Sequence, residues 1–258
     1  MIPLISKPKL VSEKGNKAVF EIDSLYPGYG VIIGNSLRRV LLSSLPGAAV
    51  YKMNIKGVAH EFSTIPGVYE DVLQIMLNLK KLRFKMFSDE PQKAVLKIKG
   101  EKQVKGKDFV SSSQLELVNK DEHIATLTDK KADLEIEIEV EKGVGYLPRE
   151  KRKMGKLAIG EIILDAIYSP VKKVGYAVEN MRVGERTDFD KVILEVETDG
   201  TIAPQKAVVD AVKIIVDHFI IIGEALKEEE KPEIQRPKKK AVKKVQKPAV
   251  KKKKSKEK

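Results

Sequence analysis

The residue types that most often do chemistry are sparse in this chain. There is no cysteine, so disulfides, thiolate nucleophiles and cysteine-ligated metals are excluded. The three histidines, His60, His123 and His218, lie far apart in the sequence, and none has metal-ligand spacing. No Ser/His/Asp or Cys/His set stands in a recognisable catalytic motif. The sequence therefore predicts a protein without a catalytic site, metal or cofactor of its own.

Three glycines, Gly28, Gly30 and Gly34, superficially resemble a phosphate-binding loop. The dinucleotide fingerprint G-x-G-x-x-G is not met, the acidic residue expected about 20 residues further on is missing, and no P-loop lysine follows. The chain therefore lacks every motif that a nucleotide-dependent enzyme would need.

Four glutamates alternate along residues 133–141, DLEIEIEVE. They are Glu135, Glu137, Glu139 and Glu141. A cation site is one explanation and a solvated sheet face is the other. The sheet face is favoured, because hard metal ions need ligands that converge from a loop, whereas these side chains stand parallel on a flat strand.

The stretch 25–50, LYPGYGVIIGNSLRRVLLSSLPGAAV, predicts a helix bracketed by turns. Glycines permit a sharp turn before it, and the Pro-Gly pair at 46–47 stops it, so we expect a helix over about 33–44. At about 100° per residue, one stripe of this helix faces a core. The stripe comprises Leu37, Val40, Leu41, Ser44 and Leu45.

The other face of this helix carries two adjacent arginines and a leucine. Arg38 and Arg39 flank Leu42, which we expect to be exposed, and neither arginine has an acidic residue three or four positions further on. A solvated polar face is the ordinary explanation of such a pattern. A protein contact is the alternative, because arginine is enriched in interface cores.

Other segments supply the expected framework. Alternating patterns predict strands at 17–23, 94–100, 133–141 and 191–198, with a less regular extended segment at 48–62. An amphipathic helix follows the Pro-Gly pair at 66–67. Its apolar positions are Val72, Ile75, Met76 and Leu79. Residues 101–131 are polar and ambiguous, and 159–171 form an apolar segment.

A basic cluster precedes that apolar segment. It comprises Arg149, Lys151, Arg152, Lys153 and Lys156. Such a cluster fits either a solvated loop or a partner contact.

The last predicted helix, from about 204 to about 230, is apolar on almost every side. A helix of this kind must be covered twice, once by its own sheet and once by something else. A second copy of the chain is the economical cover, so we predict a homodimer with this helix at the interface. The contact residues would be Val212, Ile215, Val216, Phe219 and Ile222.

The net charge of +12 is located at the C-terminus. Residues 236–258 contain 13 Lys or Arg and one acidic residue, while the rest of the chain carries 36 basic and 36 acidic side chains. The body is therefore neutral, and the tail is expected to be disordered. Its lysines either bind nucleic acid non-specifically through phosphates or only solubilise the chain. They include Lys238, Lys239, Lys240, Lys243, Lys244, Lys251, Lys252, Lys253 and Lys254.

The chain lacks sequence signals for export or membrane insertion. No apolar run has the length of a signal-peptide core or a membrane span. The absence of cysteine fits a reducing compartment, so we expect a cytoplasmic protein.

Several segments resemble one known family. YGVIIGNSLRRVLLSSLPGAAV resembles the dimerisation helix of the α subunit of bacterial DNA-directed RNA polymerase. Further matches follow in the same order, namely HEFSTIPGVYEDVLQIMLNLKKL, LTDKKADLEIEIEVEKGVGY and DAIYSPVKKVGYAVENMRVGERTDFDKVILEVETDGTI. The resemblance covers about residues 20–230.

This resemblance implies an α+β fold without an active site. A dimerisation subdomain, made of a sheet and two interface helices, would comprise 1–46 and 171–230. An inserted mixed α/β subdomain would comprise 47–170, and a disordered Lys-rich tail 231–258. In this family the homodimer holds the large subunits β and β′, which make the catalytic centre. By position, Arg38, Arg39 and Leu42 would contact β, and Leu37, Val40 and Leu41 would join the dimer interface.

Two departures from the family's pattern matter. Ala203 stands where an acidic residue usually caps the last helix. We also expect no C-terminal DNA-binding domain, with the basic tail in its place. A rival interpretation is an architectural nucleic-acid-binding protein that acts through this tail, but the neutral body argues against it.

Overall fold

The computed structural model describes residues 6–152, 158 and 160–229, and the chain divides into two compact units, Met1–Phe219 and Ile220–Lys258. The described part of the second unit, residues 220–229, is helical. Both large sheets belong to the first unit.

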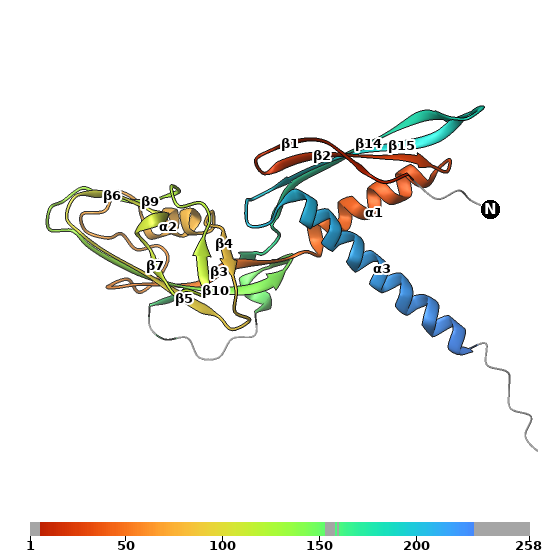
Figure 1. Cartoon of the computed structure of the whole chain (residues 1–258). Coiled ribbons are helices and arrows are strands. Elements are labelled where there is room, and N and C mark those ends of the chain that lie inside the picture. The colour runs from red at the N-terminus through yellow and green to blue at the C-terminus, as the bar shows by residue number, and fades with distance from the viewer. Residues whose placement is uncertain (1–5, 153–157, 159, 230–258) are drawn as a thin grey trace, which may run out of the picture. The chain divides into compact units, whose positions relative to one another are not determined.

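A four-stranded antiparallel sheet joins segments from distant parts of the sequence (Figure 1). Its strand order is β1-β2-β15-β14, so the N-terminal strand β2 pairs with β15, which follows residue 170, while β1 pairs with β2 and β14 with β15. Along β2 and β15 buried and less buried side chains largely alternate, as the period of two requires. The bounds are β1 Lys9–Lys14, β2 Lys17–Leu25, β14 Val171–Val183 and β15 Arg186–Thr198.

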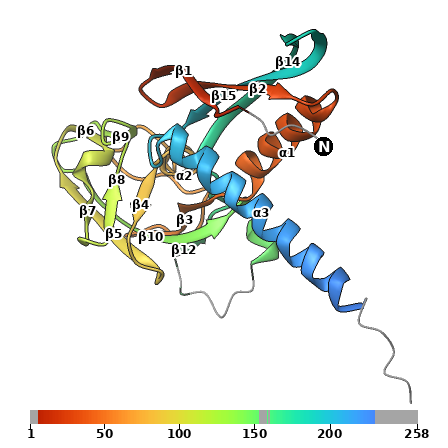
Figure 2. The same cartoon turned by 45° about the vertical axis from the view of Figure 1, so that its right-hand side comes forward.

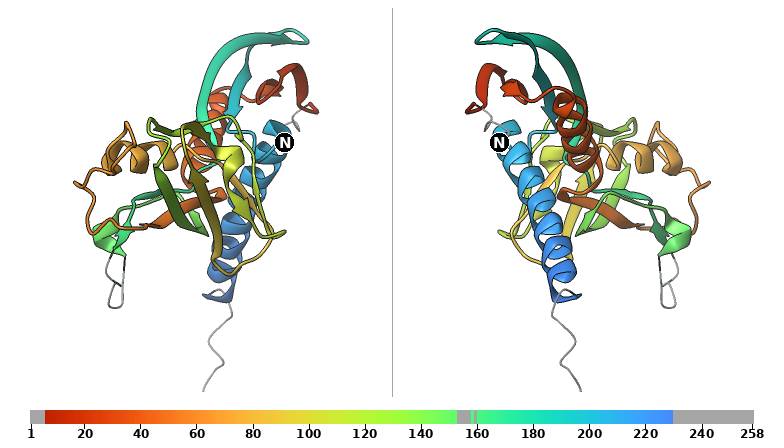
Figure 3. Two further views of the ribbon diagram at one scale, coloured as in Figure 1. Left: turned by 90° about the vertical axis from the view of Figure 1, so that its left-hand side faces the viewer. Right: turned by 90° about the vertical axis from the view of Figure 1, so that its right-hand side faces the viewer.

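Two helices cover the apolar face of this sheet. α1, Tyr29–Ser43, and the first turns of α3, Pro204–Glu229, converge on it (Figures 2 and 3). The helices contribute Leu37, Leu41, Ala207 and Ala211 to the shared buried core.

A second sheet occupies the middle of the sequence. Its order is β7-β5-β10-β3-β4-β8, and β12 pairs with β3 beside it. β10 pairs with β3 on one side and β5 on the other. The bounds are β3 Pro46–Ile55, β4 Phe84–Met86, β5 Gln92–Lys99, β7 Val110–Ser111, β8 Leu115–Leu117, β10 Asp133–Val144 and β12 Glu161–Ile163.

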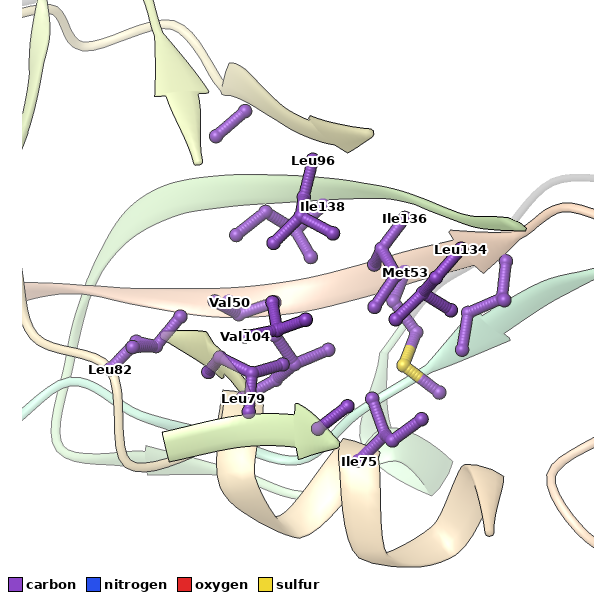
Figure 4. Close-up of a cluster of buried hydrophobic side chains, with 14 of the residues drawn as sticks. Val50, Met53, Ile75, Leu79, Leu82, Leu96, Val104, Leu134, Ile136 and Ile138 are labelled. Carbon is purple, nitrogen blue, oxygen red and sulfur yellow. The ribbon is translucent and has the colours of Figure 1, made fainter. Parts of the chain in front are cut away.

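Helix α2, Val72–Leu79, packs on this second sheet (Figure 4). Ile75 and Leu79 join Met53 and Ile138 in one buried cluster. The helix begins at an N-cap aspartate, Asp71, whose side chain accepts a hydrogen bond from Gln74 N at 2.7 Å.

Short pairs complete the fold. β6 pairs with β9, and β11 pairs with β13. Two 3-10 helices, η1 and η2, lie between them in the sequence. The bounds are β6 Lys102–Lys105, η1 Gly106–Asp108, β9 His123–Leu127, β11 Tyr146–Leu147, η2 Arg149–Lys151 and β13 Ala166–Ile167.

The predicted α+β class is confirmed, and β2, β5, β10 and β15 confirm the four alternating strands. The pattern does not reveal β1, whose side chains are all exposed, or β14, whose sequence does not alternate cleanly. The ambiguous stretch 101–131 forms four strands that are short or marginal in pattern. No helix in the described ranges is long and apolar enough to cross a membrane.

The glutamates of β10 form a charge-paired sheet face. Its ion pairs include Lys97–Glu135 at 2.5 Å, Lys93–Glu137 at 2.6 Å and Lys52–Glu139 at 3.0 Å. Burial alone would raise the pKa of Glu139, but hydrogen bonds from Tyr51 and Lys52 outweigh it and hold the pKa below its usual value. Within the described residues no group of three or more His, Asp or Glu is arranged to hold a metal ion.

A buried carboxylate ties the entry of α2 to β9. Glu70 is 8% exposed and accepts a hydrogen bond from Thr126 N at 2.6 Å, and His123 Nε2 lies 2.7 Å from Glu70 Oε1. Burial alone would raise the pKa of Glu70, but the contacts with His123 and Thr126 lower it below 4.5. The ionised form thus adds stability above pH 4.5, and this is lost as the pH falls through the lowered folded pKa.

Replacing this carboxylate by an amide, Glu70→Gln, is expected to lower the free energy of unfolding at pH 7 by about 1–3 kcal/mol. Because the advantage of the wild type depends on charge, the difference should shrink when urea unfolding is repeated near pH 4. Glu116→Gln, at an exposed position of β8, is the matched control and should change little. A difference that widened in acid would contradict this assignment.

Candidate functional site

Helix α1 presents two arginines to the outside. Arg38 and Arg39 are exposed. Among the described residues no carboxylate lies within 4.0 Å of either guanidinium. A guanidinium presents a rigid fork of donors that matches the geometry of a carboxylate.

Leu42 differs from its prediction. It is half-buried and packs against the core of the first sheet, rather than standing exposed between the arginines. α1 lies so close to the sheet that side chains beside its buried stripe also reach the core. Val40, like Leu42, is half-buried and packs against this core.

The buried stripe of α1 requires a further correction. Leu37 and Leu41, predicted at a dimer interface, are 5% and 0% exposed inside the chain's own core. Their side chains support the helix on the side that faces the sheet. The apolar side chains that α1 exposes lie nearer its start, namely Tyr29, Val31 and Ile32.

Two glycines let α1 approach the sheet closely. A Cβ on Gly30 would lie 2.8 Å from Val178 Cγ1, and a Cβ on Gly34 would lie 2.5 Å from Tyr176 Cδ2. Both separations are shorter than van der Waals contact, so any side chain at either position would push the helix away. The glycine spacing that resembles a phosphate loop therefore serves helix-on-sheet packing.

The N-terminus of α1 is occupied by a carboxylate of the chain itself. Asp190 Oδ2 accepts hydrogen bonds from Gly28 N and Gly30 N, both at 2.9 Å. Helix N-termini attract anions through their free N–H groups and dipole. Because Asp190 already fills this position, the first turn offers no cradle for a phosphate. This contact also explains why α1 begins at Tyr29, earlier than the predicted start at about 33.

Aromatic rings fix the same corner. The ring of Tyr26 meets those of Tyr29 and Phe189 edge-on, with centroid distances of 6.0 and 6.2 Å. The guanidinium of Arg186 lies 5.6 Å from the Tyr26 centroid and 5.1 Å from the Phe189 centroid. The start of α1 is thereby held against the β14–β15 hairpin.

Helix α3 exposes an apolar stripe within the first unit. Val209, Val212, Val216 and Phe219 are 65%, 42%, 46% and 68% exposed. Their spacing of three, four and three residues is the heptad pattern of helices that pack against a second helix. These positions form one seam, hereafter the α3 stripe.

The other predicted interface residues divide between the two units. Ile215 is half-buried against the chain's own core, whereas Ile222, in the second unit, is 55% exposed. His218 is exposed, and its Nδ1 lies 2.7 Å from the carbonyl oxygen of Ile214. The tail lysines from Lys238 to Lys254 lie outside the described residues.

Two arginines of the basic cluster are engaged by side chains of their own chain, whereas Lys151 is exposed. Arg152 Nη2 lies 2.7 Å from Glu141 and 3.0 Å from the Tyr168 hydroxyl, and its guanidinium stacks over Tyr51. Burial and the neighbouring Glu141 raise the pKa of Tyr168 to about 12. Arg149 pairs with Glu61 at 3.2 Å. Lys153 and Lys156 lie outside the described residues.

A hollow of about 330 Å³ lies between α2, η2 and β12. Sequence reasoning missed it, because its walls come from four segments that only folding brings together, namely 61–62, 73–80, 149–150 and 163–165. Phe62 stands 76% exposed at this hollow. The lining residues are Glu61, Phe62, Leu73, Met76, Lys80, Arg149, Glu150, Ile163, Leu164 and Asp165.

Comparison with known proteins places the chain in a family. Residues 53–169 match the family model described as RNA polymerase Rpb3/RpoA insert domain. The chain is 47% identical over 219 residues to the DNA-directed RNA polymerase subunit alpha of Symbiobacterium thermophilum, covering 83% of this chain and 69% of that protein. It is 48% identical over 217 residues to the protein of the same name from Carboxydothermus hydrogenoformans, with the same coverage. It is 46% identical over 222 residues to that of a Roseiflexus species, covering 85% of this chain and 68% of the relative.

The fold has two large sheets, with α1 and α3 packed on one and α2 on the other. The sequence similarity to polymerase α subunits covers most of the chain that forms this fold. The chain belongs to the family of bacterial DNA-directed RNA polymerase α subunits.

Adding one methyl group tests the approach of α1 to its sheet. Gly34→Ala is expected to lower stability by about 1–3 kcal/mol, because the new Cβ overlaps the Tyr176 ring. Thermal unfolding measures the loss. Gly175→Ala, on β14 with nothing within 4 Å of its Cβ, is the matched control. Equal melting temperatures for the two variants would contradict the close approach.

Proposed function

We propose that this chain is a non-catalytic assembly subunit, whose homodimer nucleates the joining of the β and β′ subunits of DNA-directed RNA polymerase. Family membership supports the polymerase role. The observation that carries the contact with β is the exposed Arg38-Arg39 pair, which has no carboxylate within 4.0 Å in the described part of the chain. The lack of catalytic motifs in the sequence supports a role in assembly rather than in chemistry.

The homodimer rests on exposed apolar surface. Four large side chains of the α3 stripe stand in water in the single chain, and a seam of this kind is stabilised by burial against a second copy. The exposed side chains at the start of α1, Val31 and Ile32, would extend the contact. Each buried large apolar side chain contributes about 1.5–3 kcal/mol, so a few of them suffice for a stable pair.

The domain layout belongs to the same proposal. Residues 1–46 and 171–230 would form the dimerisation subdomain, and 47–170 the insert. The match to the family's insert domain, 53–169, lies within the proposed insert. The separate buried clusters around the two sheets support the same division.

The basic tail carries a further part of the proposal. Its charge of +12 on an otherwise neutral chain supports weak, salt-dependent contact with DNA phosphates in the cytoplasm. The alternative, an architectural protein that acts only through such a tail, does not explain why the rest of the chain is so similar to polymerase α subunits.

Removing one guanidinium tests the contact with β. Arg39→Ala is expected to leave the dimer intact and to lower affinity for the β subunit by roughly tenfold or more, because hot-spot arginines at interfaces commonly cost about 2 kcal/mol or more. Co-purification and titration with β measure the effect. Arg182→Ala, an exposed arginine on β14, is the control. Undiminished binding of β by Arg39→Ala would remove the assigned role.

Placing a charge in the α3 stripe tests the homodimer. Val212→Glu is expected to yield monomers at micromolar concentration, because a carboxylate would be buried without a partner at the seam. Sedimentation velocity measures the state. Lys206→Glu, an exposed position on the charged flank of the same helix, should remain dimeric. A dimeric Val212→Glu would place the interface elsewhere.

A further inference from the structure

Asp190 is a buried residue of β15 whose side chain accepts two hydrogen bonds from the start of α1. It is 7% exposed, and its Oδ2 accepts both Gly28 N and Gly30 N. Within the described residues no lysine, arginine or histidine nitrogen lies within 4.0 Å of it. A buried charge must be compensated, so the N–H groups and the dipole of the helix balance this one.

Helix α1 has no cap of its own. Gly28, the N-cap residue, sits at φ 85° and has no side chain, and the first turn contains no acidic residue. The chain therefore supplies the capping carboxylate from β15, 162 residues away from Gly28 in the sequence. α1 can acquire its cap only after β15 has taken its place beside β2, where Asp190 stands opposite Leu25.

The cap determines where the helix lies. Asp190 Cβ would be 2.9 Å from a Cβ on Gly30, so the carboxylate and the backbone of the first turn are in direct contact. Arg38 and Arg39 follow about two turns later, at 1.5 Å per residue, on the same rigid element. A shift or fraying of the first turn is therefore carried to the arginine pair.

We propose that Asp190 is a positioning residue for the Arg38-Arg39 surface. It does not touch the partner. It fixes the start and tilt of α1, and it makes the presentation of the arginines depend on the completed β2-β15-β14 pairing. In a chain whose sheet is incomplete, α1 would lack its cap and the two arginines would not be held in their position. This inference rests on the proposed contact between α1 and β.

Both hydrogen bonds end on one oxygen, which gives a discriminating pair of variants. Asp190→Asn keeps an oxygen acceptor and loses the charge, whereas Asp190→Ala loses both. With the full chain and purified β subunit, Asp190→Ala should bind β about tenfold more weakly, in the range typical of a lost cap. Asp190→Asn should recover most of that affinity. Glu195→Gln, on the same strand and paired with Lys17, is the control and should bind like the wild type.

A double-mutant cycle separates positioning from general stability. If Asp190 acts through the arginines, its loss should weaken β binding much less in an Arg39→Ala background than in the wild type. Additive losses, or wild-type affinity of Asp190→Ala, would overturn the inference while leaving the contact of Arg39 with β in place. If Arg39→Ala alone binds β normally, the proposed function and this inference both fall.

Should Asp190→Ala fail to fold, Asp190→Asn decides the question by hydrogen exchange. Loss of the charge should speed exchange of the Gly30 amide and weaken β binding about threefold, since a neutral acceptor is weaker than a charged one. Unchanged exchange together with unchanged affinity would overturn the inference.

Discussion

The contact between the first turn of α1 and the β14–β15 hairpin is the constraint on which the candidate surface depends. Two glycines bring the helix backbone against the sheet, and Asp190 closes its N-terminus. These contacts tolerate little change, because the two glycine positions have no room for a methyl group and the Asp190 position buries a carboxylate. The helix that carries Arg38 and Arg39 is thus held at its start by strands from the far end of the sequence.

The same core supports the second surface. Leu37 and Leu41 of α1 and Ala207 and Ala211 of α3 are buried in one cluster with the sheet. Small alanines let α3 lie close, and its larger valines and Phe219 turn outward as the α3 stripe. In the proposed assembly, one sheet therefore orients the surface for a second copy and the surface for a large subunit. Damage to this core should affect both.

The sequence predicts those elements whose signal is local. Alternation identifies β2, β5, β10 and β15, the 3.6-residue period identifies α1 and α2, and a long run that is apolar on almost every side identifies α3. Tertiary placement is harder to predict. Leu42 carries no local sign that it packs inward, and Asp190 is one acid among many until β15 is paired with β2. The spacing of the glycines is evident in the sequence, but their role in packing is not. That role depends on Tyr176 and Val178, which lie in a strand without a clear alternating pattern.

Site-specific photocrosslinking tests most directly whether the outer face of α1 contacts the β subunit. A benzophenone side chain in place of Ser43, exposed and one turn beyond Arg39, leaves both arginines in place. When the dimer is mixed with β and illuminated, this position should crosslink to β, whereas the same group at the exposed Glu185 should not. Capture of β from position 185 and none from position 43 would contradict a large-subunit contact on α1.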